Sequence, residues 1–151
     1  MKVIFLDFDG VLNSEKYLRA QNEHGVIIDP SRMALLKQIV DKTGARIVLS
    51  TSWREHWSKS PDQCNETGRA INRIFEGYGL QIVDKTPKLC SGREDEIKAW
   101  LDRHPSVTNF VVLDDGFLGA DFLKNRFVKT SNYKKGLDEA EVKKAIEILK
   151  G

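Results

Sequence analysis

Acidic and hydroxyl side chains follow three short apolar runs of the sequence, at the point where each run ends. The first run is followed by Asp-Phe-Asp-Gly at residues 7–10, the second by Ser-Thr at 50–51, and a later one by Asp-Asp at 114–115. If these runs are parallel strands, their carboxyl ends meet at the edge where open parallel sheets bind ligands. Carboxylates and hydroxyls gathered there suit phosphate groups and a hard metal cation.

The two acids of the first group, Asp7 and Asp9, are two residues apart, so in extended chain both side chains lie on the same side. Gly10, directly afterwards, permits a sharp backbone turn. Carboxylates that face one another repel unless one is protonated or a cation lies between them. With Asp114 and Asp115 added, the pattern predicts a cation site with oxygen ligands. Mg2+ is the expected ion because it needs few protein carboxylates. Taken alone, the first pair could instead form a solvated turn after a strand, and the pair at 114–115 could cap a helix or turn.

Short apolar runs alternate with helical patterns along the chain, which predicts an α/β fold with a mainly parallel sheet. Strands are expected over residues 3–6, 46–50, 80–83 and 110–113, with a shorter one over 126–128. The expected helices begin after the capping residues Asp29, Asn65, Ser91 and Asp138. At 151 residues, the chain suits a single domain spanning 1–151.

Local signals predict where several of these helices begin and end. Asp29 is followed by proline, which is typical of a helix start, and Gly44 is placed to end that helix. Ser91 and Glu94 have the spacing of a capping box. Residues 15–28 have no clear period, and we expect them to form an irregular flap over the edge where the acids gather.

The bulk composition argues against several functional classes. A net charge of +2 gives no overall field for nucleic-acid or membrane binding. No apolar run approaches membrane-spanning length, and the first residues lack the features of a signal peptide. Cys64 and Cys90 form neither a CxxC pair nor a Cys/His cluster. Two free thiols in a reducing, cytoplasmic location are therefore expected, with no zinc site.

The residues 3–12, Val-Ile-Phe-Leu-Asp-Phe-Asp-Gly-Val-Leu, resemble the first motif of the haloacid dehalogenase-like (HAD) phosphatase superfamily. Leu-Ser-Thr at 49–51 resembles its second motif, and Val-Val-Leu-Asp-Asp at 111–115 its fourth. The stretches 50–54, 93–97 and 136–137 are similar to the small HAD domains of Swiss army knife RNA-repair proteins. The resemblance implies a three-layer, Rossmann-like sheet with helices on both faces and a minimal cap or none.

The resemblance also implies a role for each motif residue. Asp7 would be the nucleophile that forms an aspartyl-phosphate, and Asp9 the group that protonates the leaving oxygen and later activates water. Asp7, the main-chain carbonyl of Asp9, and Asp114 with help from Asp115 would hold Mg2+. Ser50 would donate a hydrogen bond to a phosphoryl oxygen. The implied activity is that of a magnesium-dependent phosphomonoesterase.

The third motif of the superfamily requires a Lys or Arg near a helix start, and the sequence offers two candidates. Arg93 falls in the first turn of the predicted helix, where the helix dipole disfavours a cation unless the cation faces an anion. An alternative is a surface pair between Arg93 and Glu96 or Asp95. Lys88 is the competing cation. We choose Arg93 as the third catalytic residue.

Other residues near the motifs are candidates for substrate binding. Trp53 and Arg54 directly follow the second motif, so they could stack a base and clamp a second phosphate. Alternatively, Trp53 and Trp57 pack a helix onto the sheet, which we favour for Trp57. Asn13 could line the mouth of the site or merely cap a turn. The full expected substrate-binding set is Gly10, Asn13, Ser50, Thr51, Trp53 and Arg54.

Without a sizeable cap, the site would be open and would suit a bulky phosphorylated substrate, with a nucleic-acid terminus favoured by the repair-domain likeness. The sequence leaves the oligomeric state open, with a monomer as one option. Two other classes remain open. A phospho-accepting receiver domain uses similar residues, although there the acid pair follows the first strand and the acceptor Asp a later one. A catalytically silent binding module on the same fold is the other alternative.

Overall fold

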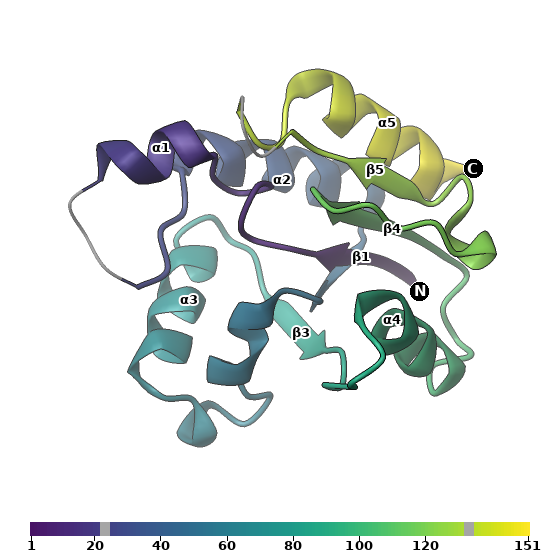
Figure 1. Cartoon of the computed structure of the whole chain (residues 1–151), viewed down its shortest axis with the longest axis horizontal. Coiled ribbons are helices and arrows are strands. Elements are labelled where there is room, and N and C mark those ends of the chain that lie inside the picture. Colours follow the sequence, from purple (N-terminus) through teal and green to yellow (C-terminus); the bar gives the residue numbers. More distant parts are fainter. Residues whose placement is uncertain (22–24, 132–134) are drawn as a thin grey trace.

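The computed structural model describes residues 1–21, 25–131 and 135–151. At its centre is a five-stranded sheet in which every neighbouring pair of strands is parallel. The strands are β1 (Lys2–Leu6), β2 (Arg46–Leu49), β3 (Ile82–Lys85), β4 (Asn109–Asp114) and β5 (Phe127–Lys129). Their order is β3-β2-β1-β4-β5, which places β1 in the middle (Figure 1). The predicted α/β fold with a parallel sheet is confirmed.

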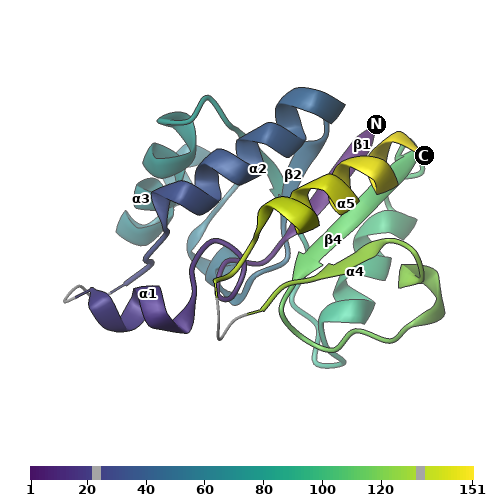
Figure 2. The same cartoon turned by 90° about the horizontal axis from the view of Figure 1, so that it is seen from above.

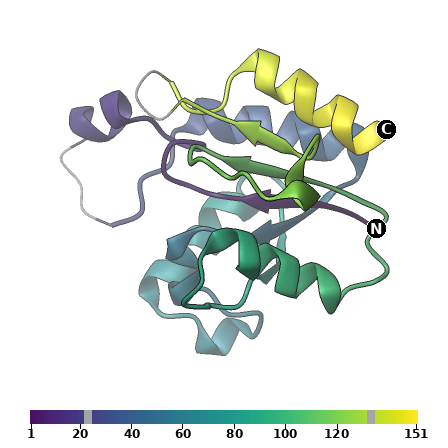
Figure 3. The same ribbon diagram turned by 45° about the vertical axis from the view of Figure 1, so that its right-hand side comes forward.

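Helices cover both faces of this sheet. They are α1 (Glu15–Ala20), α2 (Pro30–Thr43), α3 (Glu66–Glu76), α4 (Arg93–Asp102) and α5 (Glu139–Lys150), with short 3-10 helices η1 (Ser52–His56), η2 (Pro61–Gln63) and η3 (Asp121–Leu123). Helices α2 and α5 pack together over one face, and α4 covers the other (Figures 2 and 3). The three-layer arrangement is confirmed, and the described residues contain no separate cap domain. Each helix in those same ranges falls short of the length and apolarity needed to cross a membrane.

The central strand β1 is apolar on both sides because it is buried on both sides. Ile4 and Leu6 pack in a cluster with residues of α2, α3 and α5, whereas Val3 and Phe5 pack in a second cluster with α4. All four side chains are fully buried. Burial of each such side chain contributes about 1.5–3 kcal/mol. This packing fixes β1 rigidly and with it the residues at its carboxyl end.

Most of the predicted helix ends are confirmed. The side chains of Asp29, Asn65 and Asp138 each accept a backbone N–H in the first turn of their helices. Gly44 ends α2 in the left-handed conformation, with φ of 70°. Asp138 also forms a complete capping box with Glu141. These ends were predictable because their signals lie within a few residues of one another.

The capping box predicted for Ser91 and Glu94 is wrong. The N-cap of α4 is Gly92, which has φ of 107° and makes no side-chain cap. The Glu94 carboxylate instead accepts the backbone N–H of Gly119, at 2.5 Å. A loop distant in sequence therefore takes the carboxylate that the local pattern assigned to the cap.

Two further segments differ from their predicted form. Strand β3 begins two residues later than expected, because the N–H of Leu80 bonds to the carbonyl of Phe75 in the turn that ends α3. The stretch after β1 contains the helix α1, which Ser14 caps by accepting the N–H of Tyr17. The flap expected over residues 15–28 stays a prediction, and residues 22–24 of it lie outside the described ranges.

Candidate active site

The register of the three central strands brings the predicted motifs together. Leu6 at the end of β1 is level with the ends of β2 and β4. Beyond the strands, the N–H of Ser50 bonds to the carbonyl of Leu6, and the N–H of Asp7 bonds to the carbonyl of Leu113, each at 3.1 Å. Asp7 therefore lies at the carboxyl edge between Ser50 on one side and Asp114 on the other.

Three carboxylates gather at this edge. Ligand oxygens of Asp7, Asp114 and Asp115 all lie within 4.8 Å of one another. Asp7 and Asp114 are buried, with 5% and 1% of their surface exposed, and Asp115 is half-buried. Buried carboxylates this close repel one another strongly unless a cation is shared between them. Their oxygens are hard ligands, so the cluster could hold a divalent metal ion.

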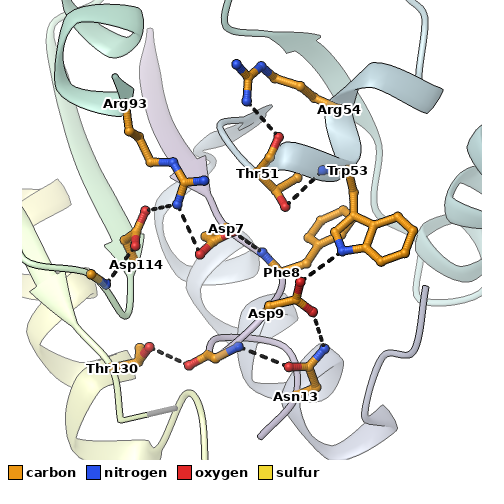
Figure 4. A network of polar contacts seen from close by, with 12 residues as sticks. Asp7, Phe8, Asp9, Asn13, Thr51, Trp53, Arg54, Arg93, Asp114 and Thr130 are labelled. Carbon is orange, nitrogen blue, oxygen red and sulfur yellow. Dashed lines mark hydrogen bonds and ion pairs between the residues drawn. The ribbon is translucent and has the colours of Figure 1, made fainter. Parts of the chain in front are cut away.

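Arg93, the first residue of α4, is the cation that reaches the acids. Its Nη1 lies 2.7 Å from Oδ2 of Asp114 and 3.2 Å from Oδ2 of Asp7 (Figure 4). The competing candidate, Lys88, is an exposed side chain that pairs with Glu55. The structure thus brings Arg93 and not Lys88 to the cluster, and the surface pairing considered for Arg93 is wrong.

The pKa values of these groups reflect burial and crowding. Burial raises the pKa of Asp7 to about 7, with Asp114 and Asp115 adding to the rise and Arg93 opposing it. Burial, followed by the charge of Asp114, also raises the pKa of Asp115. Burial alone would lower the pKa of Arg93, but the carboxylates of Asp7 and Asp114 outweigh it and raise that pKa. One guanidinium does not balance three carboxylates, which again fits a bound cation.

The buried Asp7 carboxyl leads us to expect a distinctive pH dependence of stability without metal. Between its ordinary pKa of 3.8 and its folded-state pKa of about 7, the folded protein holds a proton that the unfolded chain has released. The free energy of unfolding in chelator should therefore fall as the pH rises through this range, by on the order of a few kcal/mol from this group. Urea unfolding of wild type and Asp7→Asn at several pH values checks this. Identical pH profiles for the two proteins would contradict it.

Ser50 presents a buried hydroxyl at the same edge. Its residue is fully buried, and within the described residues its Oγ has no hydrogen-bond partner. A buried hydroxyl without a partner is costly, and its O–H is a donor suited to an oxygen of a bound ligand. The neighbouring Thr51 is used differently from the prediction, because its Oγ1 accepts the N–H of Trp53 and caps η1. Among the described residues, the Ser50 hydroxyl therefore has no protein partner, whereas the Thr51 hydroxyl already accepts one backbone N–H.

The carboxylate of Asp9 lies apart from the cluster of three acids and accepts hydrogen bonds from two donors. Trp53 Nε1 donates to Oδ2 at 3.0 Å, and Asn13 Nδ2 donates to Oδ1 at 3.2 Å (Figure 4). Asn13 also accepts the N–H of Gly10 and donates to the carbonyl of Ile27. It is 1% exposed, so it braces the loop as a turn cap and does not line the mouth of the site.

Gly10 is required by the closeness of Asp115. Its φ is +83°, and a Cβ atom there would lie 2.2 Å from Oδ2 of Asp115. The carbonyl of Gly10 accepts the hydroxyl of Thr130, which is buried just beyond β5. Thr130 did not feature in the sequence prediction, although it was available there as a polar residue at the end of a strand. It fixes the position of the Asp9–Gly10 turn.

Arg54 is not placed to bind substrate, which corrects the prediction. Its guanidinium is buried, and Figure 4 shows it in contact with Thr51 and not with the acids. It donates to Oε2 of Glu96 at 2.7 Å and to the carbonyls of Thr86 and Thr51. Arg54 therefore ties the loops after β2 and β3 to α4. Trp57 is 4% exposed and packs in the core, as favoured from the sequence.

Comparisons with known proteins agree with this geometry. The sequence model of one family, described as "HAD domain in Swiss Army Knife RNA repair proteins", matches residues 3–142 of the chain. Searches of curated proteins and of solved structures returned no match. The matched range includes Asp7, Ser50, Arg93 and the acid pair at 114–115, and it confirms the resemblance inferred from the motifs. The chain therefore belongs to the family of HAD domains found in Swiss Army Knife RNA repair proteins.

Proposed function

We propose that this protein is a magnesium-dependent phosphohydrolase that cleaves phosphate monoesters through an aspartyl-phosphate on Asp7. One observation carries the proposal. The buried Asp7 carboxylate lies within 3.2 Å of the Arg93 guanidinium and within the cluster of three acids, beside the hydroxyl of Ser50, which has no partner in the described part of the chain. A nucleophile, a cation site and donors for phosphoryl oxygens are thus adjacent, and these are the parts that phosphoryl transfer needs.

In the first half of the reaction, an oxygen of Asp7 attacks phosphorus and forms a new O–P bond. The bond from phosphorus to the leaving oxygen breaks, and Asp9 gives its proton to that oxygen to release an alcohol. Arg93 and the Ser50 hydroxyl donate hydrogen bonds to the phosphoryl oxygens, on which negative charge is concentrated. Arg93 begins α4 and Ser50 directly follows β2, so both donors are carried by packed elements and require little rearrangement during the reaction.

In the second half, water attacks the phosphorus of the aspartyl-phosphate. Asp9, now a carboxylate, accepts the proton of that water, and the bond between phosphorus and Asp7 breaks. Inorganic phosphate leaves, and both side chains return to their starting states. Asp9 therefore acts as acid and then as base.

Asp7, Asp114 and Asp115 are the residues that would hold Mg2+, together with the main-chain carbonyl of Asp9. The metal would neutralise charge on the transferring phosphoryl group. Support comes from the clustered hard oxygen ligands and from the pKa of Asp7, which burial raises and a neighbouring cation would lower.

For the substrate, we propose a phosphorylated nucleic-acid terminus. Two observations support this class: the description of the matching family and the lack of a separate cap domain among the described residues. An uncapped edge leaves room for a phosphate carried on a large molecule. A cytoplasmic location is also proposed, since Cys64 and Cys90 are both unpaired.

Phosphate release from a substrate panel tests the proposed function. The panel contains oligonucleotides with 3′- or 5′-phosphate, nucleotides, sugar phosphates and phosphopeptides, each assayed with Mg2+ and with chelator. We expect release in Mg2+ to exceed that in chelator by about 100-fold or more, because the metal offsets several kcal/mol of transition-state charge. Re-adding Mg2+ should restore the rate.

Two other outcomes would replace the proposal with its alternatives. A phosphorylated protein that persists without turnover would indicate a receiver-like domain. Binding of Mg2+ with no hydrolysis of any substrate would indicate a silent binding module.

A further inference from the structure

Trp53 makes a specific contact with the acid–base residue of the proposed reaction. Its indole N–H donates to Oδ2 of Asp9 at 3.0 Å, across 44 positions of sequence (Figure 4). Asn13 donates to the other oxygen, Oδ1, at 3.2 Å. Asp9 is itself exposed, so neither burial nor core packing restricts rotation of its carboxylate. These two donors are the groups that fix its direction.

The indole that makes this contact is itself held in place. The backbone N–H of Trp53 donates to the Oγ1 of Thr51, the cap of η1. The centroid of the indole ring lies 5.9 Å from the centroid of the His56 ring. The side chain also packs against the main hydrophobic cluster. Because the indole is anchored in this way, its N–H holds the exposed Asp9 carboxylate in a fixed orientation relative to the sheet.

We propose that Trp53 is a positioning residue that aims Asp9 at the leaving-group oxygen, and that it thereby allows cleavage of phosphate esters of aliphatic alcohols. This rests on the proposed function. An alcohol such as a sugar hydroxyl leaves poorly as an alkoxide, so it needs a proton as the bond to phosphorus breaks. A nitrophenolate ion leaves readily without one. The value of a well-aimed Asp9 therefore depends on the leaving group.

For the proton transfer, one oxygen of Asp9 must face the leaving oxygen of the substrate. The hydrogen bonds from Trp53 and Asn13 keep the carboxyl group in that orientation. The proton moves from Asp9 to the leaving oxygen while the bond between Asp7 and phosphorus forms. Asp9 becomes a carboxylate, to which the indole N–H still donates. Trp53 itself exchanges no proton and touches no reacting atom.

The chain provides matched controls, because all three tryptophans donate from Nε1 to a side-chain oxygen. Trp57 donates to Asn72 and Trp100 to Asp84, each at 2.9 Å. Trp57→Phe therefore removes an indole hydrogen bond of the same kind, four positions from Trp53, outside the site. Any effect of merely losing an indole hydrogen bond should appear in both variants.

The test compares kcat/KM of wild type, Trp53→Phe and Trp57→Phe for an alkyl phosphate and for p-nitrophenyl phosphate in Mg2+. We expect Trp53→Phe to lower kcat/KM about tenfold for the alkyl ester and less than about twofold for the nitrophenyl ester, since only the former needs the proton. Trp57→Phe should change neither. Equal losses on both esters, or no loss on either, would overturn the proposal.

A second measurement reads the contact without using activity. The three indole N–H signals of the protein are recorded in a two-dimensional proton–nitrogen spectrum, and the Trp53 signal is assigned by its loss in Trp53→Phe. Asp9→Ala should shift this signal and leave those of Trp57 and Trp100 in place. An unmoved Trp53 signal overturns the proposal. If the signal shifts but wild type hydrolyses no ester, the proposed function fails, and the contact stands without its catalytic role.

Discussion

Replacing Asp7 with asparagine is expected to abolish magnesium-dependent phosphate release while leaving the protein folded. The amide cannot form the bond to phosphorus, so the rate should fall on the order of 10^4-fold or more, as for other nucleophile replacements. Folding should survive because the substitution is nearly isosteric, and because the neutral amide replaces a carboxylate whose charged form burial disfavours, as its pKa of about 7 indicates. Phosphate release and urea unfolding measure the two effects.

A second aspartate gives the matched control for this experiment. Asp84 on β3 is partly buried and accepts the indole N–H of Trp100, away from the acid cluster. Asp84→Asn retains an oxygen that can accept this bond, and it should release phosphate at the wild-type rate. Wild-type turnover in Asp7→Asn would refute the assignment of the nucleophile. Inactivity of both variants would point to a general loss of structure.

Breaking the buried ion pair between Arg54 and Glu96 is expected to have the largest effect on stability. Both side chains are less than a tenth exposed, and their atoms lie 2.7 Å apart. Glu96 also accepts the backbone N–H of Leu89 at 2.8 Å. Arg54→Met would leave the Glu96 carboxylate buried without its cation. We expect the free energy of unfolding to fall by about 3–5 kcal/mol, measured by urea denaturation.

The double variant Arg54→Met with Glu96→Leu distinguishes two causes of the lost stability. One is the lost attraction of the ion pair, and the other is the Glu96 carboxylate left buried without its cation. If the stranded charge dominates, the double variant should recover much of the stability lost in Arg54→Met. Lys88→Met is the control, because it breaks an exposed pair with Glu55, and exposed pairs contribute little. If Arg54→Met is as stable as Lys88→Met, the buried pair contributes no more to the free energy of unfolding than the exposed pair does.

The Arg54–Glu96 pair also bears on the site through α4. Arg93 begins this helix, and Glu96 lies three residues later in the same first turns. The pair therefore holds the start of α4 against the loops after β2 and β3. Arg54, predicted as a substrate clamp, instead contributes by fixing the element that carries Arg93.

The strands of the sheet and the acids at its edge could be predicted from local patterns in the sequence. The apolar runs that form β1 and β4 are visible in the sequence without any structure, and each ends directly in its acids. The caps at Asp29 and Asp138 were equally visible. All of these features depend on neighbours within a few residues, where backbone geometry leaves few choices.

The partners of the long polar side chains could not be predicted in this way, because they depend on the packing of distant elements. Arg93 and Lys88 are similar candidates in sequence, yet one contacts Asp7 and Asp114 and the other lies on the surface. Trp53 donates a hydrogen bond to Asp9, which is 44 positions away in the sequence, and Thr130 donates one to Gly10, which is 120 positions away. Long side chains have many rotamers and reach groups on any element packed nearby. Their partners are therefore set by how the helices and loops pack, and local sequence does not contain that information.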